Sequence, residues 1–171
     1  MTTSSWQNLA KHKADEILEE VSSSFPLKAP VPITDIMEEY VGDVQIVIST
    51  DYAFPDSVSA LCKKDMDVGW LILVNGKEPS VRQRFSIAHE LAHIALFTYQ
   101  PNTMYCSHNV NDWMEDVCDQ FAGHILMPES LVREYYQSIS RPQLWEIATA
   151  FKVSRVVAQI ELQYLGLPFT T

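Results

Sequence analysis

Residues 84–97, RFSIAHELAHIALF, place two histidines and a glutamate inside an otherwise apolar stretch. Pro79 precedes this stretch, and Ser80 with Gln83 three residues later has the pattern of a capping box. A helix is therefore predicted from near residue 81 to residue 97. Its apolar residues lie on nearly every side, which predicts a buried helix. Because ionisable groups are costly to bury without partners, the rest of the fold has to supply partners for them.

His89, Glu90 and His93 form an HExxH sequence. On a helix the two histidines leave the same face about one turn apart, so that both can bind one ion. Glu90 lies about 60° around the helix from His93, where its carboxylate can take a proton from a bound water. The alternative, hydrogen-bonded core histidines and a solvent-facing glutamate, fits poorly with so apolar a helix. We predict a Zn²⁺ site with Glu90 as the catalytic residue; Mn²⁺ or Fe²⁺ would also suit the donors.

A catalytic zinc site takes three protein ligands and leaves one position open for water. A second helix is predicted from near residue 112 to a point before Pro128, and Glu115 is the acid inside its apolar arc. We therefore predict Glu115 as the third ligand. Asp119, one turn later at the edge of the arc, is predicted to hold a ligand imidazole by its free N–H. A solvated aspartate is the alternative for this position.

The remaining patterns predict an α+β fold that is mainly helical, with a small, largely antiparallel three-stranded sheet packed on the helix at 81–97. A chain of 171 residues suits one domain, so residues 1–171 are expected to form a single unit in which helices at about 129–165 are included. The other predicted elements are helices at 5–24, 34–40, 129–138, 141–151 and 154–165, and strands at 44–48, 58–63 and 68–74.

The balance of charges narrows the choice of partner and compartment. Twelve Lys and Arg against 22 Asp and Glu give a net charge of −10, which makes nucleic acid a poor candidate for the main ligand and favours a basic protein. Apolar runs stay shorter than the ~18 residues of a membrane span, so no membrane association is expected. The first residues lack the apolar core of a secretory signal, and we expect a cytoplasmic protein.

Three cysteines without CxxC spacing predict neither a disulfide framework nor a zinc knuckle. Cys62 and Cys118 are predicted to be buried, reduced thiols. Cys106 lies in a predicted loop at 99–111, between His93 and Glu115 in the sequence. As a thiolate it could act as an inhibitory fourth ligand in place of the water, and an incidental loop thiol is the alternative.

The same loop contains polar side chains that could reach the substrate. Tyr99, Tyr105 and His108 are candidates for contacts with the substrate or with the oxyanion that forms during hydrolysis. An ordinary surface histidine is the alternative for His108.

RQRFSIAHELAH at 82–93, followed by EDVCDQFAGHILMP at 115–128, resembles the ImmA/IrrE group of zinc metallopeptidases. The pattern of that group is a helix ending in HELxH and then ExxA(N/D)xFAxxLLMP. PVPITDIMEEY at 30–40 and the stretch at 144–167 also fit the resemblance. It implies a zincin-like domain with ligands at His89, His93 and Glu115 and a general base at Glu90. Phe97 stands where many members have a further histidine, which suggests that this position is not an essential ligand.

The resemblance also implies regulatory proteolysis. Such proteins cut a helix-turn-helix repressor, often encoded alongside them, and thereby switch on mobile-element, stress or defence genes. A small, basic repressor is therefore the expected substrate. Two alternatives stay open. The first is a DNA-binding regulator, because the helices predicted at 141–151 and 154–165 have the spacing of a helix-turn-helix. The second is a zinc-bound protein that binds a partner without cutting it. Few cations accompany those two helices, which disfavours DNA binding.

Overall fold

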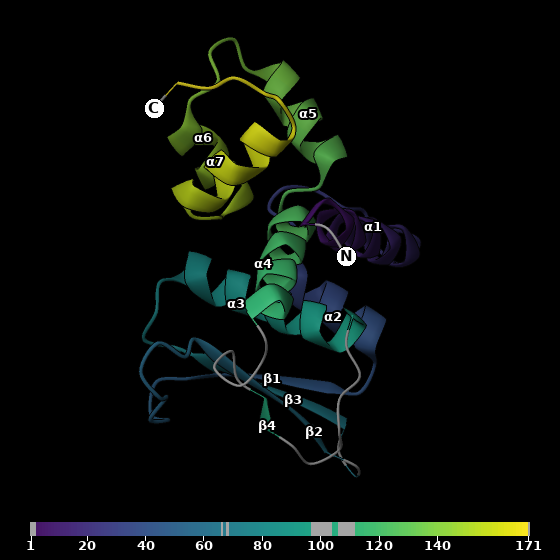
Figure 1. Cartoon of the computed structure of the whole chain (residues 1–171), viewed down its shortest axis with the longest axis vertical. Coiled ribbons are helices and arrows are strands. Elements are labelled where there is room, and N and C mark those ends of the chain that lie inside the picture. Colours follow the sequence, from purple (N-terminus) through teal and green to yellow (C-terminus); the bar gives the residue numbers. More distant parts are fainter. Residues whose placement is uncertain (1–2, 66, 68, 97–103, 106–111, 171) are drawn as a thin grey trace.

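A computed structural model describes residues 3–65, 67, 69–96, 104–105 and 112–170 of the chain (Figure 1). These residues form seven helices and four strands, which confirms the predicted α+β fold. The helices are α1 (Thr3–Val21), α2 (Ile33–Val41), α3 (Ser80–Leu96), α4 (Asp112–Leu126), α5 (Glu129–Ser138), α6 (Leu144–Phe151) and α7 (Arg155–Tyr164). The strands are β1 (Val44–Ser49), β2 (Ala60–Asp65), β3 (Gly69–Asn75) and β4 (Met104–Tyr105).

The sheet is mixed, with the strand order β1-β3-β2-β4. β2 pairs antiparallel with β3 and with the two-residue β4, as the prediction of a largely antiparallel sheet requires. β1, however, runs parallel to β3, with Val44 opposite Trp70 and Ser49 opposite Asn75. β4 is a fourth strand, inside the stretch that was predicted as a loop. Turn residues between strands mark where each strand ends, but they do not determine which strand becomes its neighbour.

Gly69 allows β1 and β3 to start side by side. Its φ is +82°, in the left-handed region that favours glycine. Trp70 N–H donates a 2.8 Å hydrogen bond to the carbonyl oxygen of Asp43. A Cβ atom at position 69 would lie 2.3 Å from that oxygen. Any larger residue would therefore force the two strands apart.

α3 lies between the sheet and α4. The sheet packs under α2 and α3, α4 lies over α3, and α1 packs beside α4 (Figure 1). Buried side chains from all these elements belong to one hydrophobic cluster, in which Ile72 of β3, Leu91 of α3 and Phe121 of α4 are fully buried. The central position of α3 explains why its sequence is apolar on nearly every side.

Helices α5, α6 and α7 lie at the end of α4 that is far from the sheet (Figure 1). α7 contacts α4, and α6 packs against α7. α6 begins at Leu144, later than predicted, because Gln143 is extended and pairs with Thr170 of the returning terminal segment.

A single domain over residues 1–171 stays a prediction. Within the described part of the chain, no helix is long and apolar enough to cross a membrane.

Candidate metal centre

The HExxH residues lie on α3, in the helix that the sequence predicted. The two imidazoles point to the same side of the helix, and their Nε2 atoms are 3.1 Å apart. Glu90 is 5% exposed and lines a small pocket together with Ala60 of β2. The two imidazoles and the Glu90 carboxylate are therefore held within a well-packed part of the molecule.

α4 brings two carboxylates to these histidines. Glu115 Oε2 lies 3.1 Å from His89 Nε2, and Glu115 Oε1 lies 3.3 Å from His93 Nε2. Asp119, one turn further along α4, lies with Oδ1 2.8 Å from the other nitrogen of His89, Nδ1. The fold thus brings together the five residues named for the centre, from two helices separated in the sequence.

The histidine and glutamate charges depend on each other. Burial alone would lower the pKa of His89, but its hydrogen bonds with Asp119 and Glu115 outweigh this and raise the pKa to about 9. Burial would likewise raise the pKa of Glu115, but its contacts with His89 and His93 lower the pKa to about 2. These contacts with the two imidazoles stabilise the ionised form of the Glu115 carboxylate.

Glu90 differs from Glu115 in its electrostatic environment. Burial raises the pKa of Glu90, and the neighbouring Glu115 carboxylate raises it further, while His89 and His93 act in the opposite direction. A carboxyl group whose pKa is raised is a better proton acceptor when ionised. The two glutamates are therefore suited to different tasks: Glu115 to holding a cation, and Glu90 to exchanging a proton.

The arrangement fits a metal ion. Glu115 Oε1 is buried and accepts no hydrogen bond from any described residue, since its contact with His93 Nε2 falls outside hydrogen-bond geometry. Two imidazole Nε2 atoms and a carboxylate converging from two helices form a donor set typical of zinc hydrolases. Asp119 completes the arrangement, because a carboxylate on Nδ1–H leaves Nε2 of His89 free to bind an ion.

A pocket of about 140 Å³ gives access to these groups. Ser57, Ser59 and Ala60 line its side toward the sheet, and Phe85 and Ser86 belong to α3. His89, Glu90, Glu115 and Asp119 line the same pocket. Four of the five residues of the candidate centre therefore face one pocket.

Residues 50–163 match the family model described as the IrrE N-terminal-like domain, Peptidase M78. The match covers more than half of the chain and includes both helices of the candidate centre. The chain belongs to this family. The ImmA/IrrE resemblance is thereby confirmed, and the family model is named for peptidases. No curated protein sequence matches the chain significantly.

The fold of this Peptidase M78 member is similar to a solved structure, a Mycobacterium tuberculosis transcriptional regulator. The TM-score is 0.62 and the sequence identity is 16%, so the likeness concerns the fold. It covers 89% of this chain and 46% of the regulator. The chain therefore spans less than half the length of that protein.

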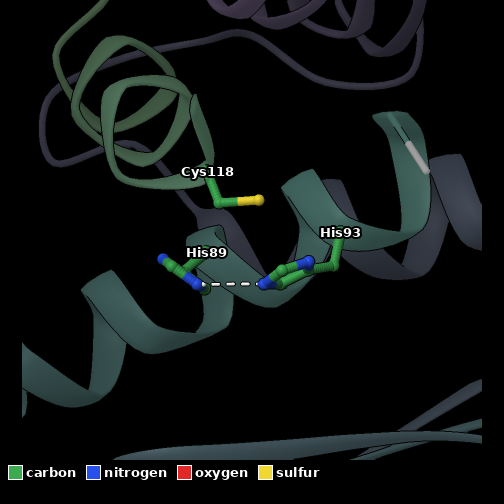
Figure 2. Close-up of side chains that lie close together, drawn as sticks. All are labelled: His89, His93 and Cys118. Carbon is green, nitrogen blue, oxygen red and sulfur yellow. Dashed lines mark hydrogen bonds between the residues drawn. The ribbon is translucent and has the colours of Figure 1, made fainter. Parts of the chain in front are cut away.

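Cys118 of α4 is a further candidate ligand in this family member. A ligand atom from each of His89, His93 and Cys118 lies within 4.8 Å of the others, so this cluster could bind a metal ion. Figure 2 shows the sulfur pointing from α4 toward the two imidazoles on α3. Sequence reasoning predicted a buried thiol, which is confirmed, but missed its place beside the histidines. The available signal was its spacing from Glu115, since helical residues three apart share a face.

Of the two candidates for the third ligand, Glu115 is the stronger. Burial raises the pKa of the Cys118 thiol, and the carboxylates of Glu115, Glu90 and Asp119 raise it further. An ion could bind Cys118 only by displacing the proton of this thiol, because the thiolate is the form that binds metals. The Glu115 carboxylate is already ionised and within 3.1–3.3 Å of both histidines.

The remaining candidates lie outside the described residues or away from the centre. Tyr99, Cys106 and His108 are not among the described residues, and of Tyr105 the structure describes only the backbone, in β4. Their roles stay predictions. His124 faces away from the centre, where its Nδ1 lies 2.8 Å from Oε2 of the buried Glu161.

Proposed function

We propose that the chain is a metal-dependent endopeptidase that binds one ion through His89, His93 and Glu115. The convergence of the two Nε2 atoms and the Glu115 carboxylate, within 3.1–3.3 Å of one another, is the observation that supports this most directly. Zn²⁺ is the expected ion, because two histidines and a glutamate are a donor set of zinc peptidases. Mn²⁺ or Fe²⁺ would bind through the same atoms.

In this proposal the chain's own groups carry the proton transfers. When bound, the ion supplies a Lewis acid for the scissile carbonyl and the attacking water. Glu90 accepts the proton of that water and delivers it to the leaving amine, so that no covalent enzyme intermediate forms. Asp119 acts as a positioning residue, because its bond to Nδ1 fixes the tautomer and the orientation of His89.

The proposed substrate is a small, basic helix-turn-helix repressor in the cytoplasm, whose cleavage would derepress mobile-element, stress or defence genes. Three observations support it. The chain carries a net charge of −10, which suits a basic partner. The ImmA/IrrE resemblance implies such a substrate. The similar Mycobacterium tuberculosis protein is a transcriptional regulator, which associates this fold with the control of transcription.

A DNA-binding regulator is the second candidate, because α6 and α7 follow one another closely and the similar structure is a transcriptional regulator. The surface of α7 argues against it. Val156 and Ile160, which are exposed on α7, are apolar where a recognition helix would present cations. Salt-dependent DNA binding that requires Arg155 would favour this candidate. The third candidate is a metal-bound protein that binds its partner without cutting it.

The decisive experiment compares the parent chain with Glu90→Gln. A small, basic helix-turn-helix protein encoded next to this chain serves as the substrate, and metal content is measured by mass spectrometry. We expect Glu90→Gln to retain its metal and to lose cleavage by a factor of about 10²–10⁴, the usual contribution of a general base. Glu134→Gln, an exposed change on α5, is the matched control. If Glu90→Gln cuts as fast as the parent, the hydrolytic mechanism is wrong.

A further inference from the structure

A groove of about 440 Å³ lies between α3, α4 and α7. Its volume falls within the roughly 300–1,000 Å³ that is typical of ligand pockets. Much of its lining is apolar: Val81 and Phe85 from α3, and Val156, Val157 and Ile160 from α7. A groove of this kind suits an aliphatic or aromatic group.

The groove adjoins the pocket of the candidate metal centre. Arg82, Phe85 and Asp119 line both. Phe85 and His89 are neighbours, with ring centroids 6.5 Å apart, and Asp119 is hydrogen-bonded to His89. A polypeptide lying across the metal centre can therefore place a nearby side chain in the groove without leaving the surface.

On the α7 side of the groove, two large apolar side chains are exposed to solvent. Val156 is 67% exposed and Ile160, one turn later, is 55% exposed. The two side chains are neighbours on one helix face beside the candidate centre, and contiguous exposed apolar surface marks interaction sites. Its continuity with the metal centre indicates the substrate polypeptide as the occupant.

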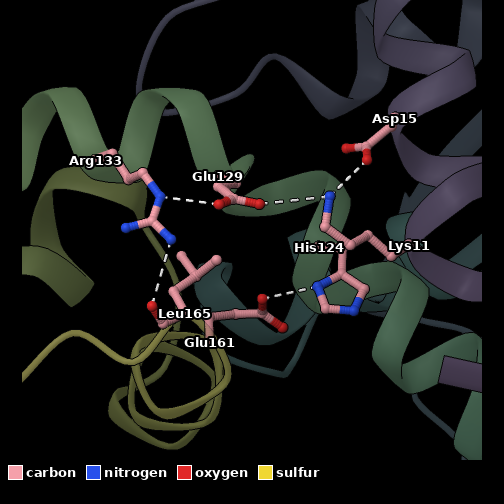
Figure 3. A network of polar contacts seen from close by, with 7 residues as sticks. All are labelled: Lys11, Asp15, His124, Glu129, Arg133, Glu161 and Leu165. Carbon is pink, nitrogen blue, oxygen red and sulfur yellow. Dashed lines mark hydrogen bonds and ion pairs between the residues drawn. The ribbon is translucent and has the colours of Figure 1, made fainter. Parts of the chain in front are cut away.

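A close approach of α4 and α7 shapes the floor of the groove. A Cβ atom at Gly123 would lie 2.4 Å from Glu161 Oε1, so glycine is what lets the Glu161 carboxylate reach α4. The same carboxylate then accepts a hydrogen bond from His124, and both side chains are buried (Figure 3). Ion pairs of Glu129 with Lys11 and with Arg133 lie nearby (Figure 3). The buried contact between His124 and Glu161 therefore joins α7 to α4 at this wall of the groove.

We propose that this groove receives an apolar side chain of the substrate close to the scissile bond, and so determines which peptide bonds are cut. The inference rests on the proposed peptidase function. It makes α7 part of the substrate-binding surface, whereas the sequence predicted only that the C-terminal helices belong to the same domain. It names the substrate class as polypeptides with a large aliphatic or aromatic residue beside the cut.

The first test measures binding without catalysis. The full chain carrying Glu90→Gln is labelled with ¹⁵N and titrated with N-acetyl-leucinamide and, separately, with N-acetyl-aspartamide. We expect the leucine probe to shift the amide signals of Gly123, Val157 and Ile160, and the aspartate probe to leave them unchanged. Ile160→Ala should weaken leucine binding by roughly tenfold, because it removes part of the apolar wall that the probe contacts.

Ile48→Ala is the matched control, because Ile48 is the same residue type and also 55% exposed, but lies on the edge strand β1. It should leave binding unchanged. Probe shifts centred elsewhere, or equal weakening by both substitutions, would overturn the proposal. So would a dimer, measured by sedimentation, that Ile160→Ala dissociates, because a second copy would then occupy the groove.

The second test separates this inference from the proposed function. The metal-loaded parent chain digests reduced, unfolded casein, and the cut sites are read by mass spectrometry. We expect large apolar residues at one fixed position beside the cut, and a loss of that preference in Ile160→Glu but not in Ile48→Glu. Cleavage without an apolar preference overturns the groove proposal alone. If casein and the neighbouring repressor both stay uncut, the proposed function is wrong.

Discussion

His89 Nδ1 and Asp119 Oδ1 lie 2.8 Å apart, which joins α3 to α4 on the side of the imidazole that faces away from His93. The side chain of His89 is 12% exposed, whereas that of Asp119 is 60% exposed. A solvent-facing carboxylate thus determines the orientation of a nearly buried ring. Because Nδ1 is hydrogen-bonded to Asp119, Nε2 is the nitrogen of His89 that can bind an ion.

Asp119→Asn should weaken metal binding by about 10–100-fold, the usual effect of losing a carboxylate that orients a ligand histidine. The affinity is measured by competition with a chromophoric chelator. Asp116→Asn, on the same helix and exposed, is the control and should bind as the parent does. Equal affinities for the parent and Asp119→Asn would mean that Asp119 is an ordinary surface residue.

Glu115→Gln should reduce metal binding more than Asp119→Asn does, because it removes the negatively charged donor rather than the support of another donor. The bound metal per chain is measured after dialysis. Glu134→Gln, an exposed glutamate on α5, controls for the general effect of removing a charge. Full metal content in Glu115→Gln would assign the third ligand to another residue, with Cys118 the first to test.

Cobalt distinguishes Glu115 from Cys118 directly. Thiolate coordination gives Co²⁺ an intense near-ultraviolet charge-transfer band, which histidine and carboxylate ligands do not. We expect the Co²⁺-loaded chain to lack this band, because the Glu115 carboxylate lies within 3.1–3.3 Å of both histidines and is the proposed third ligand. Cys118→Ala should have the same spectrum as the parent. A strong band that disappears in Cys118→Ala, but persists in Cys62→Ala, would show that Cys118 binds the metal.

The buried contact between His124 and Glu161 should stabilise the packing of α7 on α4. His124→Ala leaves the Glu161 carboxylate buried without its partner and should lower the free energy of unfolding by about 1–3 kcal/mol. Urea denaturation measures the change, and His12→Ala at an exposed position is the control. Adding Glu161→Ala to His124→Ala should cost less than the sum of the two single changes. Additive effects would mean that the two side chains act independently.

One domain over residues 1–171 predicts one cooperative unfolding transition. Amide signals of Ile72 on β3 and Leu162 on α7, both fully buried, report on opposite ends of the molecule. We expect both to disappear at the same urea concentration as the far-ultraviolet circular dichroism signal. Earlier loss of the Leu162 signal would show that α5–α7 unfold as a separate unit.

Local patterns in the sequence were enough to predict the two helices that hold the candidate centre. The HExxH spacing places His89 and His93 on one face whatever surrounds the helix, because the helical repeat is fixed by the backbone. The apolar arc around Glu115 likewise indicated which acid of α4 faces inward. These inferences concern residues within one helix, where sequence spacing determines geometry.

Contacts between segments far apart in the chain were harder to predict from the sequence. The parallel pairing of β1 with β3 was not predicted, because the turn signals between strands fix their ends and not their neighbours. Cys118 was predicted as buried, but its approach to His89 and His93 depends on how α4 rotates and crosses over α3. Residues 97–103 and 106–111 lie outside the described part of the chain, so the roles of Cys106, Tyr99 and His108 stay predictions.

From the chain alone one could predict the α+β class, the helix that carries two histidines and a glutamate, and the acid of α4 that lies beside them. Periodicity and spacing act within one element and are readable from the chain. The packing of the helices was needed to show that Cys118 lies beside the imidazoles and that α7 lines an apolar groove next to the candidate metal centre. Both depend on side-chain packing between helices far apart in the sequence, where no local repeat specifies the contact.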